Sequence, residues 1–172
     1  MNANSRPTRV IRRKRERPEP ETFVFWDIVS CPVPNGHDAR LVGPSIKSAL
    51  NDGGYTHPIT ITAIGFLPYT ENQTRTLYDL PELTATGINV IYVPKGYNEI
   101  MDYVRNWTWF HPRPATILFI TGAVIHKYFY SSVSKLHDNG YTILHAYPGA
   151  KSTETKSVKS TFSWESIILQ GV

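Results

Sequence analysis

Five short apolar runs recur along the chain, and segments of helical period fill the intervals between them. The runs cover residues 22–28, 58–66, 88–94, 115–121 and 141–147, and each is rich in β-branched or aromatic residues. Strands that alternate with helices pair in parallel, because each helix carries the chain back across a sheet that is buried on both faces. The sequence therefore predicts an α/β fold, a three-layer sandwich around a five-stranded, mostly parallel sheet.

Aromatic residues in the helical segments divide into two groups. In the segment 98–110, Ile100, Val104 and Trp107 recur at helical spacing and form a stripe that we expect to face the sheet. The same spacing places Phe129 in the core. Ordinary packing is one interpretation of the remaining aromatic residues, and a surface on which bases stack is the other. These residues are Trp109, Phe110, Tyr128 and Tyr130.

Most of the basic charge lies in the first 20 residues. They carry seven basic and two acidic side chains, a net charge of +5 (7 − 2), so the rest of the chain carries −1 (4 − 5). A segment with this charge, several prolines and few large apolar residues buries too little surface to fold. We therefore predict a disordered basic tail over residues 1–21. Its candidate nucleic-acid-binding residues are Arg12, Arg13, Lys14, Arg15 and Arg17.

The same basic run has two other interpretations, a nuclear localisation signal within residues 12–17 and a solvated leader with no specific role. Beyond the tail we predict one folded domain over 22–150, then a polar linker and a short C-terminal segment over 151–172 that packs on the domain. No apolar run approaches the roughly 18 residues of a membrane span. Because the N-terminus lacks a secretory core and the lone Cys31 cannot form an internal disulfide, we expect an intracellular protein, in the cytoplasm or the nucleus.

Asp27 ends the first predicted strand and is the only acid at the carboxyl ends of the five predicted strands. In open parallel sheets, ligands bind at this edge. A metal-dependent nuclease needs several carboxylates there, because both a hydrated divalent cation and its attacking water must be held. A structural role is also open to Asp27, since its carboxylate can accept hydrogen bonds from the N–H groups of the turn that follows.

The turn after this strand carries a family resemblance. The stretch FWDIVSCPVPNG, which begins at Phe25, resembles the W-D-F-E-N-C-P-V-P signature of NYN domains. These are PIN-like ribonucleases found in the limkain-type meiosis regulator and mRNA stability factor proteins and in plant relatives. The resemblance continues through LPELTATGINVIYVP, HPRPATILFIT, LHDNGYTILHAYP and FSWESIIL, so it covers residues 22–169. It implies a PIN-like fold and an RNA-related function, in a plant-like member of the family.

Active members of this family are similar to other PIN-like nucleases, which hold Mg²⁺ or Mn²⁺ with a cluster of acids and hydrolyse RNA. The first of these acids is present as Asp27, but Val29 and Ser30 replace the glutamate and asparagine that usually follow. After the fourth strand, Ala123 and Ile125 stand where the family carries acids. The resemblance therefore implies a degenerate acidic cluster.

The stretch PKGYNEIMD after the third strand falls where the family carries a further aspartate. Tyr97 or Asn98 occupies that position, and Glu99 and Asp102 lie nearby but out of register. The resemblance thus leaves Asp27 as the candidate catalytic and metal-binding residue, with Glu99 and Asp102 as secondary candidates. Loss of metal ligands usually lowers activity by orders of magnitude, because neither the metal nor the nucleophile is then positioned.

Three functional hypotheses follow. The first is an RNA-binding or RNA-regulatory pseudo-nuclease that cleaves RNA weakly or not at all and needs no cofactor. The second is an active Mg²⁺- or Mn²⁺-dependent endoribonuclease in which Asp27 acts with Glu99 or Asp102. The third is a protein-interaction module that binds no nucleic acid and exposes a contiguous apolar patch. The first two imply single-stranded RNA as the partner, and the family resemblance alone implies an association with peroxisomes.

Overall fold

The computed structural model describes residues 20–65, 81–93, 97–111, 115–122, 127–149 and 156–169. The predicted basic tail lies outside these ranges except for its last two residues, and so does most of the segment between the second and third predicted strands. Among the described residues, no helix is both long enough and apolar enough to cross a membrane.

Six strands form one sheet. They are β1 (Glu21–Asp27), β2 (Ile59–Gly65), β3 (Asn89–Tyr92), β4 (Ala115–Ile120), β5 (Thr142–Tyr147) and β6 (Ser160–Ser163). Their order across the sheet is β3-β2-β1-β4-β5-β6, and each neighbouring pair is parallel. The predicted α/β fold with a parallel sheet is confirmed, and the sheet has one strand more than the five expected.

The additional strand, β6, is absent from the prediction because its sequence, STFS, contains a single apolar residue, Phe162. This strand lies at the edge of the sheet and pairs with β5, where Phe162 lies opposite Ala146. Its side chains are exposed or half-buried, so no run of apolar residues marks it. The C-terminal segment therefore extends the sheet.

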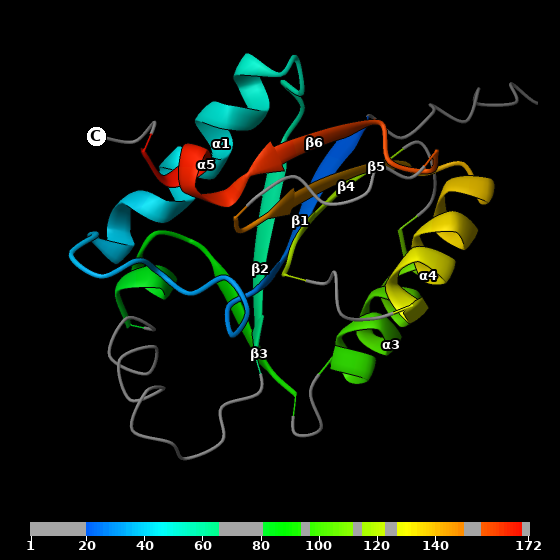
Figure 1. Ribbon diagram of the computed structural model, residues 1–172, viewed down its shortest axis with the longest axis horizontal. Helices are drawn as coiled ribbons and strands as arrows, with labels where there is room; N and C mark the ends of the chain where they lie inside the picture. The colour runs from blue at the N-terminus through cyan, green and yellow to red at the C-terminus, as the bar shows by residue number, and fades with distance from the viewer. Residues whose placement is uncertain are drawn as a thin grey trace, which may run out of the picture.

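Helices cover both faces of the sheet. They are η1, a short 3-10 helix (Ala39–Leu41), α1 (Val42–Asp52), α3 (Tyr97–Thr108), α4 (Lys127–Asp138) and α5 (Trp164–Leu169), with a further helical turn at 81–85. Figure 1 shows α1 and α5 on one face of the sheet and α3 and α4 on the other. The helices and the sheet thus form the three layers of the predicted sandwich.

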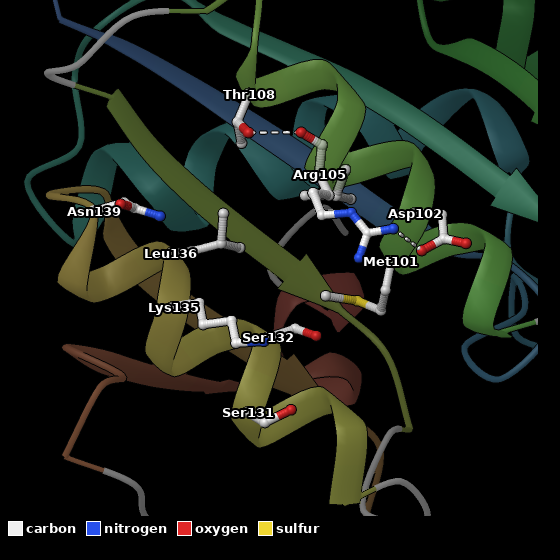
Figure 2. Close-up of a pocket in the computed structure, with 10 residues that line it drawn as sticks. Met101, Asp102, Arg105, Thr108, Ser131, Ser132, Lys135, Leu136 and Asn139 are labelled. Atoms are coloured by element: carbon white, nitrogen blue, oxygen red, sulfur yellow. Dashed lines mark hydrogen bonds and ion pairs between the residues drawn. The ribbon is translucent and has the colours of Figure 1, made fainter.

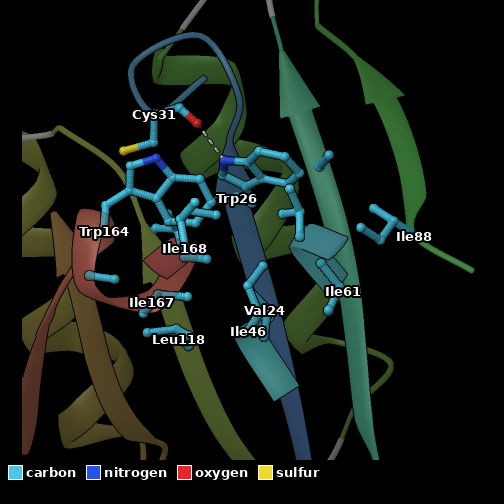
Figure 3. Packing of buried hydrophobic residues seen from close by; sticks show 14 of the residues in the cluster. Val24, Trp26, Cys31, Ile46, Ile61, Ile88, Leu118, Trp164, Ile167 and Ile168 are labelled. Atoms are coloured by element: carbon cyan, nitrogen blue, oxygen red, sulfur yellow. Dashed lines mark hydrogen bonds between the residues drawn. The ribbon is translucent and has the colours of Figure 1, made fainter. Parts of the chain in front are cut away.

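Strand β1 supplies side chains to both layers of core, because successive residues of a strand point to opposite faces. Val24 and Trp26 join the cluster that includes residues of α1 and α5, whereas Phe23 and Phe25 join the cluster under α3 and α4. The Trp26 ring lies beside the ring of Trp164 in α5, with the two centroids 5.4 Å apart (Figure 3). Burial on both faces fixes β1 in the middle of the sheet.

Helix α5 is short, but its apolar side is buried. Trp164 is 3% exposed, and Ile167 and Ile168 are buried with it. The Trp164 indole N–H also donates to the carbonyl oxygen of Pro32, at 3.3 Å. Because Pro32 belongs to the turn after β1, α5 holds that turn in place as well as closing the core.

We expect Trp164→Ala to lower the free energy of unfolding by about 3–5 kcal/mol, because the change leaves a large cavity against Trp26. Urea unfolding followed by circular dichroism measures this change. Leu169→Ala is the matched control in the same helix, since Leu169 is 63% exposed and its truncation should cost less than about 0.5 kcal/mol. Equal stability of the two variants would mean that α5 is not part of the core.

Candidate functional site

The strand order places a reversal of winding between β1 and β4. Connections from β1 run outward through β2 to β3, and those from β4 run outward through β5 to β6. In sheets of this kind, ligands bind beyond the carboxyl ends of the two strands that flank the reversal. Here these ends are Asp27, the last residue of β1, and Thr121, which follows β4. The predicted site residue Asp27 thus lies at the position where the fold places a binding site.

The Asp27 carboxylate is occupied by hydrogen bonds from the protein itself. Its Oδ1 atom accepts from the backbone N–H groups of Val29 and Ser30, at 3.1 and 3.2 Å. Its Oδ2 atom accepts from the hydroxyls of Ser30 and Thr121, at 2.6 and 3.3 Å. A carboxylate offers about four acceptor positions, so these four donors fill them.

A further contact joins the turns that follow β1 and β4. The backbone N–H of Gly122 donates to Ser30 Oγ at 2.9 Å, and Ser30 Oγ donates in turn to Asp27. The two turns approach so closely that a Cβ atom at Gly122 would lie 3.3 Å from Ser30 Cβ. Donors from the protein itself therefore bridge the crevice in which ligands bind in related architectures.

Glu99 and Asp102 occupy different places on α3. Glu99 lies in the first turn of the helix and is half-buried. Asp102 is exposed one turn later and forms an ion pair with Arg105, with 2.6 Å between Oδ1 and the guanidinium (Figure 2). Asp102 therefore pairs with a neighbour on its own helix.

Several positions of the family's acidic cluster lie outside the described residues. Ala123 and Ile125 belong to them, as do the side chains of Tyr97 and Asn98. Within the described ranges, no group of three or more His, Cys, Asp or Glu side chains is placed to hold a metal ion.

One acid near this edge is missing from the sequence prediction. Glu165 follows β6, and its carboxylate accepts hydrogen bonds from the backbone N–H of Gly149 and the hydroxyl of Ser163, at 3.1 and 3.0 Å. Burial acts to raise the pKa of Glu165, but the hydrogen bonds outweigh burial and lower it. The prediction omits Glu165 because it omits β6, and the Ser-x-Glu pattern at 163–165 is the signal that marks the turn.

Comparison with known protein families agrees with the fold described above. The family model of the NYN domain matches residues 21–166. The chain belongs to the NYN domain family. No curated protein matches the sequence. The match begins at the first residue of β1 and ends within α5, so the family's domain includes the whole sheet.

NYN nucleases are usually metal-dependent, and a divalent cation of that kind would bind in this crevice. Mg²⁺ requires near-octahedral oxygen ligands that include carboxylates. Asp27 offers acceptor positions that are already filled, and the hydroxyls of Ser30 and Thr121 use their hydrogens to fill them. The described residues therefore do not fit a metal centre of the family's kind.

Cys31 and His145 lie close to the same crevice and are both buried. Burial raises the pKa of the Cys31 thiol to about 12, so the thiol is protonated at neutral pH and is a packing residue rather than a nucleophile. Burial lowers the pKa of His145, whose Nε2 atom lies 3.1 Å from the carbonyl oxygen of Thr121. Because a carbonyl oxygen only accepts, the neutral imidazole donates there and holds the turn after β4.

We expect Asp27→Asn to lower the free energy of unfolding by about 1–3 kcal/mol, because the amide loses the charge and half of the acceptor positions that the four donors need. Urea unfolding at neutral pH measures the change. Asp52→Asn is the control at an exposed carboxylate, and it should cost less than about 0.5 kcal/mol. A gain in stability from Asp27→Asn would contradict this role, since relief of repulsion is what an acidic cluster predicts.

Proposed function

We propose that this NYN domain binds single-stranded RNA and regulates it without efficient cleavage, as a degenerate relative of the metal-dependent endoribonucleases. The family membership gives a nuclease-type, RNA-related domain. The proposal of weak or absent cleavage is carried by the Asp27 carboxylate, whose four acceptor positions are filled by Val29, Ser30 and Thr121. These hydrogen bonds use the lone pairs of the carboxylate. A cation could therefore bind Asp27 only if hydrogen bonds of the turn were broken.

Sequence features support the finer parts of the proposal. The likeness of FWDIVSCPVPNG to the limkain-type signature supports placing the chain in that subgroup of the family. The basic residues Arg12, Arg13, Lys14, Arg15 and Arg17 would supply affinity for phosphates. The basic run 12–17 supports a nuclear localisation signal, and the compartment that we propose is the nucleus or the cytoplasm.

Cleavage is the first test. Incubated with single-stranded RNA and Mn²⁺ or Mg²⁺, the full chain should produce no more fragments than the Asp27→Asn variant, measured by gel electrophoresis of end-labelled RNA. Glu99→Gln and Asp102→Asn extend the comparison to the secondary candidates. Metal-dependent cleavage that chelation stops and Asp27→Asn abolishes would establish the alternative, an active endoribonuclease that uses Asp27 with Glu99 or Asp102.

Salt dependence of RNA binding is the second test. Replacement of Arg12, Arg13, Lys14 and Arg15 by alanine removes four charges and should weaken binding, and it should reduce the slope of log affinity against log salt by about 3. The control keeps the arm and neutralises three exposed lysines of the domain, Lys47, Lys156 and Lys159. If deletion of residues 1–19 leaves affinity and slope unchanged, the arm has no role in binding. Absence of binding at any salt would favour the protein-interaction module.

A further inference from the structure

A cavity of about 430 Å³ lies between α3 and α4 (Figure 2). Its apolar lining comes from Met101, Val104 and Leu136, all of which are 9% exposed or less. Ligand pockets generally have volumes of about 300–1,000 Å³ and combine an apolar lining with a few polar groups. This cavity, which we call the α3–α4 groove, therefore has the size and the lining of a binding site.

The polar groups of the α3–α4 groove favour an anionic ligand. Arg105 of α3 and Lys135 of α4 line it together with Asp102, which gives the groove a net charge of +1 (2 − 1). Lys135 forms no ion pair within the described part of the chain. The Arg105–Asp102 pair is exposed on both sides, at 71% and 58%, so it is weak, and Arg105 can turn to another anion at little cost.

Two adjacent aromatic side chains follow the helix that forms one wall of the groove. Thr108 lines the groove at the end of α3, and Trp109 and Phe110 come directly after it. Both rings are 82% exposed, whereas the neighbouring Trp107 packs edge-on against Phe23. Exposed aromatic faces are the usual platforms on which the bases of single strands stack, and stacking accepts every base.

The other aromatic residues that the helical spacing does not place in the core, Tyr128 and Tyr130, do not extend this platform. Tyr130 is half-buried and packs edge-on against Phe129, with centroids 5.5 Å apart. The side chain of Tyr128 lies outside the described residues. Trp109 and Phe110 are thus the two aromatic side chains, of the described part of the chain, with the greatest exposure.

The edge of the sheet on which Trp109 and Phe110 lie is also the edge at which the basic arm joins the domain. The ring of Phe23, near the start of β1, contacts the rings of Trp107 and His111, with centroids 4.3 and 5.1 Å apart. An extended chain spans at most about 3.6 Å per residue, so Arg17 lies within roughly 11 Å of Pro20. Chain length therefore limits how far Arg17 can lie from this edge.

We propose that the α3–α4 groove, with Trp109 and Phe110 at its end, is the surface through which the domain binds single-stranded RNA. This inference rests on the proposed RNA-binding function. Lys135 and Arg105 meet a phosphate, and bases stack on Trp109 and Phe110. Hydroxyl groups of the groove, among them that of Ser132, face the ribose. Trp109 and Phe110 lie past the end of α3, near the amino ends of the strands and away from the edge that carries Asp27.

RNA fits this surface better than a protein partner. The groove combines cations and hydroxyls with its apolar lining, and the first 20 residues of the chain carry a net charge of +5 (7 − 2). A polyanion with flat bases matches both features. A protein interface would instead show aromatic and aliphatic side chains gathered in one apolar core.

The test is binding of a labelled single-stranded RNA of mixed sequence to the full chain and its variants. The double variant Trp109→Ala, Phe110→Ala should lose affinity at least tenfold with an unchanged salt slope, because stacking releases no counterions. Lys135→Ala should lower the slope by about 0.7. RNA should also quench the fluorescence of the wild type, and Trp109→Phe should remove most of that quenching.

Tyr92→Ala is the matched control. Tyr92 is also exposed, at 59%, but it ends β3 and so lies at the carboxyl edge of the sheet. Its variant should bind like the wild type. If the wild type binds RNA and only Tyr92→Ala weakens binding, or no variant does, this surface is wrong while RNA binding stands.

Two other outcomes overturn the inference in different ways. A wild-type chain that binds no RNA contradicts both the surface and the proposed function. If the double variant changes the sedimentation of the chain from dimer to monomer without changing RNA affinity, the aromatic pair is a protein interface. Unfolding midpoints check that each variant folds, and the fluorescence signal of Trp109 tests the surface without relying on a multiple substitution.

Discussion

Four hydrogen bonds converge on the Asp27 carboxylate at the point where the two halves of the sheet meet. Three of them come from the turn after β1, and the fourth comes from Thr121 at the end of β4. Winding reverses at this point, so no helix connects β1 directly to its neighbour β4 beyond their carboxyl ends. The Asp27 network, extended by Gly122 to Ser30, therefore joins the turns that follow β1 and β4.

The same network sets what the crevice can do chemically. Acids that share a metal repel one another when the metal is absent, so a nuclease site lowers the stability of its own fold. A single carboxylate surrounded by N–H and O–H donors raises stability instead. Both arrangements need Asp27 at the end of β1, but only the donors around it decide which one is present. Here Ser30 supplies two of those donors, at the position where the family usually carries asparagine.

The sheet was largely predictable, because β1, β2, β4 and β5 are buried apolar runs whose composition marks them. Strand β6 was not, since an edge strand needs only one apolar residue, Phe162, and backbone pairing supplies the rest. The turn role of Asp27 follows from its position before a turn. Its partner Thr121 is 94 residues away, and no local pattern reports a contact between two loops at that separation.

The separation of the two edges would allow a domain of this family to bind RNA without the acids of the family's cluster. Strand β1 has seven residues, so its ends lie roughly 20 Å apart at about 3.3 Å per residue. Groups separated by more than about 10 Å contribute nearly independently to the free energy. The proposed contacts of RNA with Trp109 and Lys135 would therefore not depend on whether Asp27 at the other edge holds a metal or a turn. Loss of the acidic cluster would then remove cleavage and leave the proposed binding surface as it was.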